Sequence, residues 1–396
     1  MDGAELSCHT GALTGMVNDI EVAVIGGGLV GLLTASALQA QLPSTSLALF
    51  EAESHLGEQN STRNSEVLHA GIHYQTGSLK HRLCIAGNQA WRTLASRFDI
   101  PLRACGKYVV ATSSKEQPRL QALLTHAKRN RVPGFRAATA AERRSLGAQV
   151  RIAAAAFFPS SATIDTATAV ERLDAHLSNL GVPLLRHSNV LSLARQRGGL
   201  ALELAAGEPV RARVVVNCAG LGAVRLRRTL GLHALTDHWV KGQYLVTAQP
   251  WGLGPLVYPL PPSGNQGLGI HISFDPEGGL RFGPDANPVE RLDFSVDSNL
   301  VDQLTPRVLN LFPKVDPSRL RLGYAGIRPQ VWQAGVPHPD FWLAGPERSG
   351  VPGYFECAGI ESPGLTAAPA LASELARAVY AELAPGAPPS VLIELR

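Results

Sequence analysis

The clearest hydrophobic pattern in the chain lies between Glu21 and Glu51. EVAVIGG predicts a buried strand, LVGLLTASALQAQL after it predicts a helix with little polar face, and SLALFE predicts a second strand. No charged residue stands between the two glutamates, a length that matches a membrane span. Glycines interrupt its first half and Pro43 its second, however, so we interpret it as the βαβ unit of a buried parallel sheet.

Helical and strand patterns alternate after this unit. We expect helices over 77–98, 115–132 and 163–181, and strands over 105–113 and 153–159. The last of these helices would end at a glycine cap.

The remainder of the chain is mostly strand-like until a closing helix. Residues 182–220 alternate strands with Gly-rich turns, and residues 239–345 are dense in Pro, Gly and aromatics, with strand-like runs such as GQYLVTA. This composition is typical of an antiparallel sheet. Residues 366–384 then predict a long helix.

Composition excludes several classes of function. The 36 Lys and Arg against 32 Asp and Glu give a net charge of +4, and the scattered basic residues leave no nucleic-acid footprint. Five cysteines, without metal-ligand spacing, indicate reduced thiols and no metal site. We therefore expect a cytoplasmic protein, with contact at the periphery of the inner membrane left open. Residues 1–18 lack a basic start and an apolar run, so we expect a flexible extension and no secretory signal.

A glycine motif follows the first predicted strand. Gly26, Gly28 and Gly31 form G-x-G-x-x-G between strand and helix, and Glu51 stands 20 residues after Gly31. The glycines permit a tight turn, a close approach to a pyrophosphate and close packing of helix on strand. The phosphate would lie at the positive end of the helix dipole, and Glu51 would accept hydrogen bonds from ribose hydroxyls. A turn without a ligand is the weaker interpretation.

A second glycine turn favours FAD over NAD as the dinucleotide. VVVNCAGLGA, residues 214–223, predicts a strand that returns to the same sheet and helps to enclose a large cofactor. No second complete G-x-G-x-x-G is present, so we expect no separate NAD(P)H domain. The electrons would therefore come from the substrate.

These patterns predict an α/β fold, α+β overall. A Rossmann-like FAD-binding domain would be joined to a second, mainly antiparallel-sheet substrate-binding domain. We expect the FAD-binding domain to comprise 19–104, 160–232 and 346–396, and the substrate-binding domain to comprise 105–159 and 233–345.

Several blocks together resemble a known family. RNSEVLHAGIHY, CGKYVVAT, KGQYLV, GIRPQ and GIESPGLTAAPALA are similar to the FAD-dependent D-amino-acid-oxidase-type superfamily, and most to its L-2-hydroxyglutarate dehydrogenase/oxidase branch. The blocks span nearly the whole chain. RNSEVLHAGIHY and GIESPGLT are much more selective than the glycine motif. The resemblance implies FAD-dependent oxidation of a small 2-hydroxy acid, L-2-hydroxyglutarate, to 2-oxoglutarate by hydride transfer to flavin N5.

The resemblance also assigns residues to the cofactor. It implies that STRNS wraps the pyrophosphate, so that Arg63, Asn64 and Ser65 supply a cation and hydrogen-bond donors. Backbone N–H groups at the start of the last helix would stabilise negative charge on the reduced flavin. The full set expected to bind FAD is Gly26, Gly28, Gly31, Glu51, Arg63, Asn64, Ser65, Val190, Ala219, Gly220, Gly359, Gly364, Leu365 and Thr366.

Three further residues would act on the substrate. The resemblance implies that His69 stands over the flavin ring and that Arg328 binds a substrate carboxylate, which a guanidinium contacts in bidentate fashion. His69 or His271 would accept the hydroxyl proton, because a histidine pKa lies near neutrality. Each has a plainer interpretation: a core histidine for His69, a sheet face for His271 and a surface ion pair for Arg328. Further candidates to line the substrate pocket are Tyr74, His73, Lys241 and Gln243.

Rival functions share parts of this pattern. An FAD-dependent oxidase or dehydrogenase of amino acids or N-methylated amines would share the fold and the arginine. A non-catalytic flavin-binding or tRNA-modification accessory protein would be favoured by a basic groove or an extra domain, and neither is visible in the sequence. His73 replaces an arginine of related glycerol-3-phosphate dehydrogenases, which weakens the case for a phosphorylated substrate. The segment 283–325 lacks a larger insert of longer relatives, so the exact substrate stays open, as does the electron acceptor, quinone or oxygen.

Overall fold

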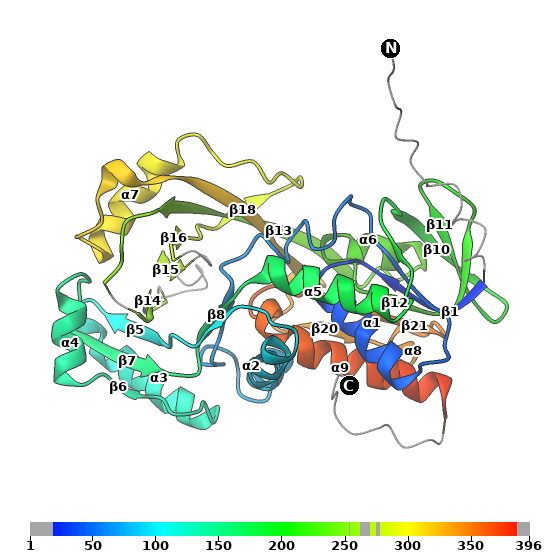
Figure 1. The fold of residues 1–396 in the computed structure, drawn as a ribbon, viewed down its shortest axis with the longest axis horizontal. Coiled ribbons are helices and arrows are strands. Elements are labelled where there is room, and N and C mark those ends of the chain that lie inside the picture. The colour runs from blue at the N-terminus through cyan, green and yellow to red at the C-terminus, as the bar shows by residue number, and fades with distance from the viewer. Residues whose placement is uncertain (1–18, 253, 262–269, 275–277, 386–396) are drawn as a thin grey trace, which may run out of the picture.

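The computed structural model describes residues 19–252, 254–261, 270–274 and 278–385. The extension predicted over 1–18 lies outside the described residues. The chain forms two lobes, each built around its own sheet, and the long strands β13 and β18 run from one lobe toward the other (Figure 1).

The first lobe contains an eight-stranded sheet whose central strands are parallel. The predicted βαβ unit is confirmed, since β1 pairs in parallel with β2 on one side and with β12 on the other. The strands are β10 (Val190–Gln196), β11 (Gly199–Leu204), β12 (Val210–Asn217), β1 (Asp19–Ile25), β2 (Leu47–Phe50) and β9 (Leu184–Leu185) in spatial order, with β21 (Tyr354–Ala358) on β12 and β20 (Trp342–Ala344) on β21.

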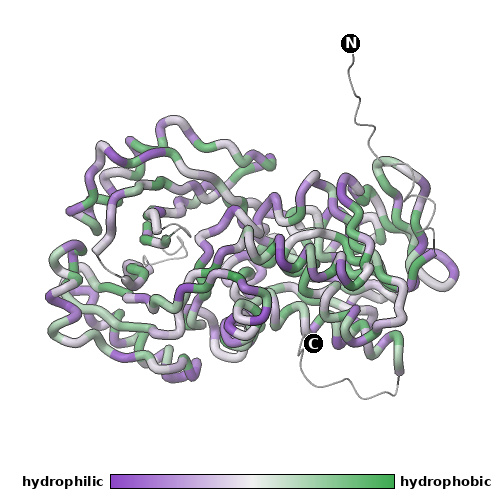
Figure 2. The backbone as a smooth tube through the Cα atoms, in the orientation of Figure 1, coloured by the Kyte–Doolittle hydropathy of each residue, from purple (hydrophilic) through white to green (hydrophobic). Residues whose placement is uncertain are grey.

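This sheet is covered on both faces, which explains its continuous apolar strands. Val22 and Val24 of β1 enter one core with the helices, whereas Ala23 and Ile25 enter a second core on the other face. Hydrophobic segments accordingly gather inside this lobe (Figure 2). The helices of the lobe are α1 (Leu29–Gln41), α2 (Leu79–Arg97), α5 (Thr166–Asn179), α6 (Ala223–Thr229), α8 (Pro346–Ser349) and α9 (Gly364–Leu383).

The second lobe contains a ten-stranded sheet that is antiparallel except where β14 meets β5. Its strands are β19 (Val336–Pro337), β18 (Arg321–Gln333), β13 (Leu235–Thr247), β16 (Leu280–Gly283), β15 (His271–Phe274), β14 (Leu256–Pro259), β5 (Lys107–Ala111), β7 (Ala154–Phe158) and β6 (Arg136–Ala137), with β17 (Asn287–Val289) on β13. Three helices accompany it: α3 (Gln117–Arg129), α4 (Ala140–Gly147) and α7 (Leu300–Leu311).

A small sheet of β3 (Val67–Leu68), β8 (Ala162–Ile164) and β4 (Leu102–Arg103) completes the described strands. β20 pairs with β21 in the first sheet, although the predicted division placed residues 342–344 in the substrate-binding domain. The division into two domains otherwise stays a prediction.

Candidate active site

A cavity of about 1600 Å³ is lined by residues of both large sheets and of the loop 57–75. Pockets for single ligands measure about 300–1,000 Å³. This cavity therefore has room for a large cofactor together with a small substrate.

The glycines at one end of the cavity are needed for close approach of the backbone. A Cβ on Gly26 would lie 2.4 Å from the carbonyl oxygen of Cys218, and one on Gly31 would lie 1.9 Å from the carbonyl oxygen of Gly26. A Cβ on Gly28 would lie 2.9 Å from the Ser61 hydroxyl. The glycine motif thus forms a cradle that any side chain would fill, as a dinucleotide-binding turn requires.

The N-terminus of α1 opens onto this cradle. The N–H of Leu29 donates to the Ser61 hydroxyl over 2.9 Å, and Gly28 at the N-cap offers no side chain. The first turn contains no acidic residue, so its positive end is left for an anion. Ser61 begins the STRNS segment but was not among the residues of that segment assigned to the cofactor.

Glu51 is held in place at the end of β2. One carboxylate oxygen accepts a hydrogen bond from the N–H of Gly27 over 2.6 Å, and the other accepts one from Glu53 over 2.8 Å. Burial raises the pKa of Glu51, and these backbone hydrogen bonds oppose the shift. The side chain lines the cavity beside the glycine turn, and its role toward a ribose stays a prediction.

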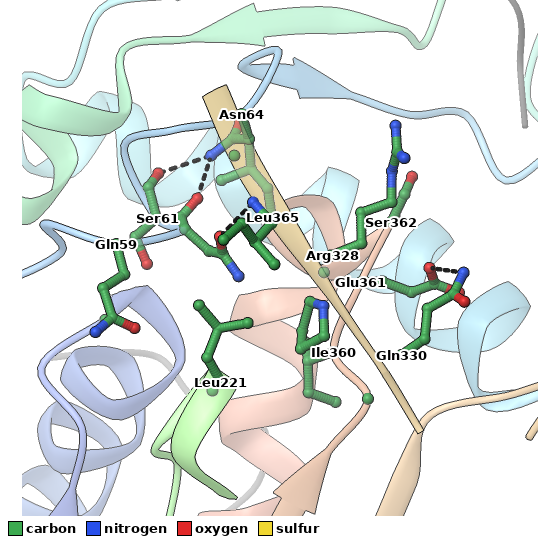
Figure 3. Close-up of a pocket in the computed structure, with 18 of the residues that line it drawn as sticks. Gln59, Ser61, Asn64, Leu221, Arg328, Gln330, Ile360, Glu361, Ser362 and Leu365 are labelled. Atoms are coloured by element: carbon green, nitrogen blue, oxygen red, sulfur yellow. Dashed lines mark hydrogen bonds between the residues drawn. The ribbon is translucent and has the colours of Figure 1, made fainter. Parts of the chain in front are cut away.

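The STRNS segment lines the cavity on the side labelled by Asn64 and Ser61 in Figure 3. Asn64 uses its amide within the loop, donating to the carbonyls of Asn60 and Ser61 and accepting from Glu66. Arg63 donates through Nε to Glu58, while its Nη atoms have no hydrogen-bond partner in the part of the chain that the structure describes. Asn64 therefore shapes the loop, and Arg63 retains free donors for an anion.

His69 is fixed through its own backbone. Its N–H donates to the Thr366 hydroxyl over 2.9 Å, and its carbonyl accepts from Asn88 over 3.0 Å and from the Cys84 thiol. The ring Nε2 lies 3.5 Å from the Ser362 hydroxyl. Thr366 does not itself line the cavity, so in this structure it orients the residue that does.

Two histidines of the site, His69 and His73, have pKa values below the usual range. The pKa of His69 lies well below its usual range because of burial, followed by the positive charge of Lys107 and the proximity of His271 and His73. Burial, Lys107 and His126 lower the pKa of His73 to about 3. A neutral imidazole can accept a proton at physiological pH.

Arg328 on β18 extends into the cavity, as its label in Figure 3 marks. One Nη donates to the backbone carbonyl of Asp285 over 3.2 Å. Among the described residues it pairs with no carboxylate. A half-buried guanidinium without an acidic partner fits a ligand carboxylate.

His271 and Tyr258 lie together at the same cavity. Their rings are stacked with centroids 3.8 Å apart, and Tyr258 meets His69 edge-on at 6.3 Å. Both histidines named as candidate bases therefore line one space, as do His73 and Tyr74.

Lys241 and Gln243 do not line the cavity, in contrast to the prediction. Side chains alternate along β13, and it is Val240, Gly242 and Tyr244 that line the cavity. Lys241 instead pairs with Asp293 over 2.8 Å, and the side chain of Gln243 donates to Asp285 over 3.0 Å.

The remaining cofactor candidates separate into two groups. Gly31 packs against the backbone behind the cradle, and Thr366 supports His69. The cavity is lined by Gly26, Gly28, Glu51, Arg63, Asn64, Ser65, Val190, Ala219, Gly220, Gly359, Gly364 and Leu365.

A cluster of three polar side chains at the cavity was also not predicted from the sequence. Lys80 pairs with Glu361 over 2.9 Å, and Gln330 donates to the other oxygen of that carboxylate over 3.1 Å (Figure 3). Glu361 lies in the selective block GIESPGLT, and this block was the feature of the sequence that could have indicated a role for it. Within the described residues no group of His, Cys, Asp and Glu is arranged to hold a metal ion.

A parallel sheet with a glycine cradle and a free helix N-terminus, opposed by an antiparallel sheet across one large cavity, defines a flavin-binding oxidoreductase. A family model described as FAD dependent oxidoreductase matches residues 21–378. The chain belongs to this family, and FAD is its cofactor.

Known proteins extend the comparison. The chain is 32% identical to a mitochondrial L-2-hydroxyglutarate dehydrogenase of Arabidopsis thaliana over 92% of this chain and 84% of the relative. It is 31% identical to an L-2-hydroxyglutarate dehydrogenase of Salmonella houtenae, over 66% of this chain and 63% of the relative. The chain thus covers less than two thirds of the second relative's length.

The fold is shared with solved flavoenzymes. An L-α-glycerophosphate oxidase from Mycoplasma pneumoniae with FAD bound superposes with a TM-score of 0.80 at 23% identity, covering 91% of this chain and 94% of that one. A glycine oxidase from Geobacillus kaustophilus gives a TM-score of 0.77 at 23% identity, covering 91% and 95%. Of the described helices, none is both long and apolar enough to span a bilayer.

Proposed function

We propose that the chain oxidises L-2-hydroxyglutarate to 2-oxoglutarate, with a quinone or oxygen as the final electron acceptor. The observation that carries this proposal is the presence, in one cavity, of an arginine that has no acidic partner among the described residues and of two histidines, His69 and His73, whose pKa values are lowered. The first two relatives described above are both named L-2-hydroxyglutarate dehydrogenases.

Arg328 would hold the carboxylate next to the reacting carbon. Bidentate contact fixes the plane of that carboxylate and therefore which face of C2 is turned toward the cofactor, so that the single hydrogen of C2 points at the cofactor in one enantiomer. This selection explains why only one enantiomer would react.

His69 or His271 would take the proton from the substrate hydroxyl. Removal of that proton lets the oxygen form a carbonyl as the C2 hydrogen leaves with its electron pair, so one proton and one hydride depart together. FAD, when bound, supplies the acceptor for that hydride. Thr366 and Asn88 keep His69 oriented through both sides of its peptide backbone.

The N-terminus of α9 would favour negative charge near the cofactor. Gly364 and Leu365 line the cavity at the start of this helix, and Pro363 at the N-cap makes no side-chain hydrogen bond. The positive helix end stabilises an adjacent anion.

Steady-state assays test the proposal against its rivals. The FAD-bound protein is assayed with L- and D-2-hydroxyglutarate, glycine, N-methylglycine and glycerol 3-phosphate, with a quinone analogue or oxygen as acceptor. We expect turnover of L-2-hydroxyglutarate with stoichiometric 2-oxoglutarate. Faster turnover of glycine or N-methylglycine would favour the amino-acid oxidase alternative. Dependence on the quinone analogue in place of oxygen would make contact with a membrane the next question.

A further inference from the structure

Lys107 is the most unusual charged residue of the second lobe. Its side chain is fully buried, and its ammonium group has no hydrogen-bond partner among the described residues. Lysines are almost never fully buried without a partner, because burial of an unpaired charge is costly. Lys107 belongs to the block CGKYVVAT, and the proposed function assigns no role to this block.

Lys107, Tyr258 and His271 form a row across three neighbouring strands. β14 lies between β5 and β15, and the register aligns Leu256 with Lys107 and Val257 with Ile272. By the alternation of side chains, the three members of the row point to the same face of the sheet.

The contacts within this row are close. The Lys107 ammonium lies 4.4 Å from the ring centroid of Tyr258, and the His271 ring stacks on Tyr258 at 3.8 Å with an interplanar angle of 19°. An ammonium beside an aromatic ring is attracted by the ring electrons. A second cation on the same ring would be repelled by the first, so this arrangement disfavours an imidazolium at His271.

The same cation acts on His69. The groups whose charges face His69 come from three elements: Lys107 on β5, His271 on β15 and His73 in its own loop, with Tyr258 of β14 at its edge. Besides Tyr258, His69 and His73, the titratable groups that face Lys107 are the thiols of Cys84 and Cys105. All of these influences lower the pKa of His69; burial is the largest, and the charge of Lys107 follows it.

We propose that Lys107 is a positioning residue of the active site, whose buried ammonium group keeps His69 and His271 uncharged and so available as proton acceptors. The proposal rests on the proposed function, in which one of these histidines takes the hydroxyl proton. Lys107 acts through Tyr258 and through space, since it does not itself line the cavity.

The direction of the effect follows from the charges. Burial lowers the pKa of Lys107 to about 8, so at pH 7 most molecules carry the ammonium. A nearby cation lowers a histidine pKa, because it disfavours the charged imidazolium. Loss of this cation raises the pKa of His69, and the histidine then becomes protonated at a higher pH.

The test measures histidine protonation directly and needs no substrate. Protein labelled with ¹³C at histidine Cε1 is titrated by NMR from pH 5 to pH 8.5, and the His69 signal is assigned by its absence in His69→Asn. In the wild type we expect no titration of His69 in this range. In Lys107→Met we expect the pKa of His69 to rise, so that its titration enters this range from the acidic end.

Two further variants make the result specific. Lys128→Met removes a positive charge from the exposed face of α3 and is expected to leave the His69 signal unchanged. Lys107→Gln, which retains a polar end, replaces Lys107→Met if that variant does not fold.

The proposal is overturned if His69 already titrates near its usual pKa in the wild type, or if neither Lys107 variant moves it. A parallel profile of kcat/KM against pH should show the acidic limb shifted upward by the same amount. If the histidine titration moves but no 2-hydroxy acid is oxidised, the role of Lys107 stands and the proposed substrate fails.

Discussion

Arg328 and His69 line the same cavity but differ in their electrostatic environments. Among the described residues, Arg328 has only a backbone carbonyl as hydrogen-bond partner, whereas burial and Lys107 hold the pKa of His69 well below its usual range. A dicarboxylate with a hydroxyl next to one carboxylate needs both: a fixed cation for binding and a neutral base for proton transfer.

Replacement of Arg328 tests the carboxylate contact. Arg328→Lys retains a charge but loses the planar fork, and Arg328→Ala loses both. Hydrogen bonds to charged groups are worth about 1.5–3 kcal/mol, so we expect kcat/KM to fall at least about 10-fold in Arg328→Lys and further in Arg328→Ala. Arg291→Lys, at an exposed position, is the control. An unchanged kcat/KM in Arg328→Ala would exclude this arginine as the carboxylate ligand.

Thr366 tests the support of His69. Thr366→Val leaves the buried N–H of His69 without its acceptor, which costs about 1–3 kcal/mol. We expect kcat to fall about 10-fold or more with FAD content retained, and Thr366→Ser to restore it. If Thr366→Val loses FAD instead, the hydroxyl serves the cofactor, as the sequence had predicted.

At the scale of elements, helices and strands with long apolar patterns were easier to predict than those whose ends depend on a cap or whose pattern a proline interrupts. The first βαβ unit was predictable because its apolar runs are long and its glycines punctuate them. α5 begins at Thr166 because the Asp165 side chain caps it by accepting from Thr168, and residues 162–164 before it form β8. α7 was not predicted, since Pro306 within it argues against a helix.

The sequence also did not predict which face of a strand is turned toward the cavity. Both faces of β13 contain polar residues, so alternation alone does not tell which face meets the cavity. The antiparallel pairing of β13 with β18 sets that phase. Lys241 and Gln243 were consequently chosen from the wrong face, and Tyr244 was missed.

The turn before α1 allows a test of the glycine cradle. Gly31→Ala would place a Cβ 1.9 Å from the carbonyl oxygen of Gly26, so the helix must move away from the strand. We expect purified Gly31→Ala to contain little or no FAD by absorbance, with secondary structure retained by circular dichroism. Gly254→Ala, where a Cβ meets nothing within 4 Å, should bind FAD as the wild type does. Full FAD occupancy of Gly31→Ala would contradict the assigned role.

At the scale of the molecule, the cavity is formed by segments far apart in the chain. Tyr324 of the second sheet donates to the carbonyl of Asn64, and the Arg281 guanidinium pairs with the buried Glu66 over 2.6 Å. These contacts tie the loop 57–75 to the second sheet. The hydrophobic periodicity of a sequence does not reveal such long-range pairings. The selective sequence blocks, in contrast, did indicate which segments line the cavity.

Cofactor removal should therefore loosen both lobes together. A ligand bound only by the native state stabilises it by about 2.7 kcal/mol at roughly 100 times its Kd. We expect apoprotein to unfold at a lower temperature than holoprotein in scanning calorimetry, and added FAD to raise its Tm in proportion to the logarithm of FAD concentration. NAD at equal concentration is the control. A Tm that does not respond to FAD would contradict a cofactor enclosed between the two sheets.

The most direct test of the account is anaerobic reduction of the bound flavin. The FAD-bound protein is mixed without oxygen with L- or D-2-hydroxyglutarate, and the visible absorbance is followed while 2-oxoglutarate is measured. If the proposed function is right, we expect rapid bleaching with the L enantiomer alone and one 2-oxoglutarate formed per flavin. Absence of bleaching with the L enantiomer would contradict the proposed substrate, and bleaching by both enantiomers would contradict the selection attributed to Arg328.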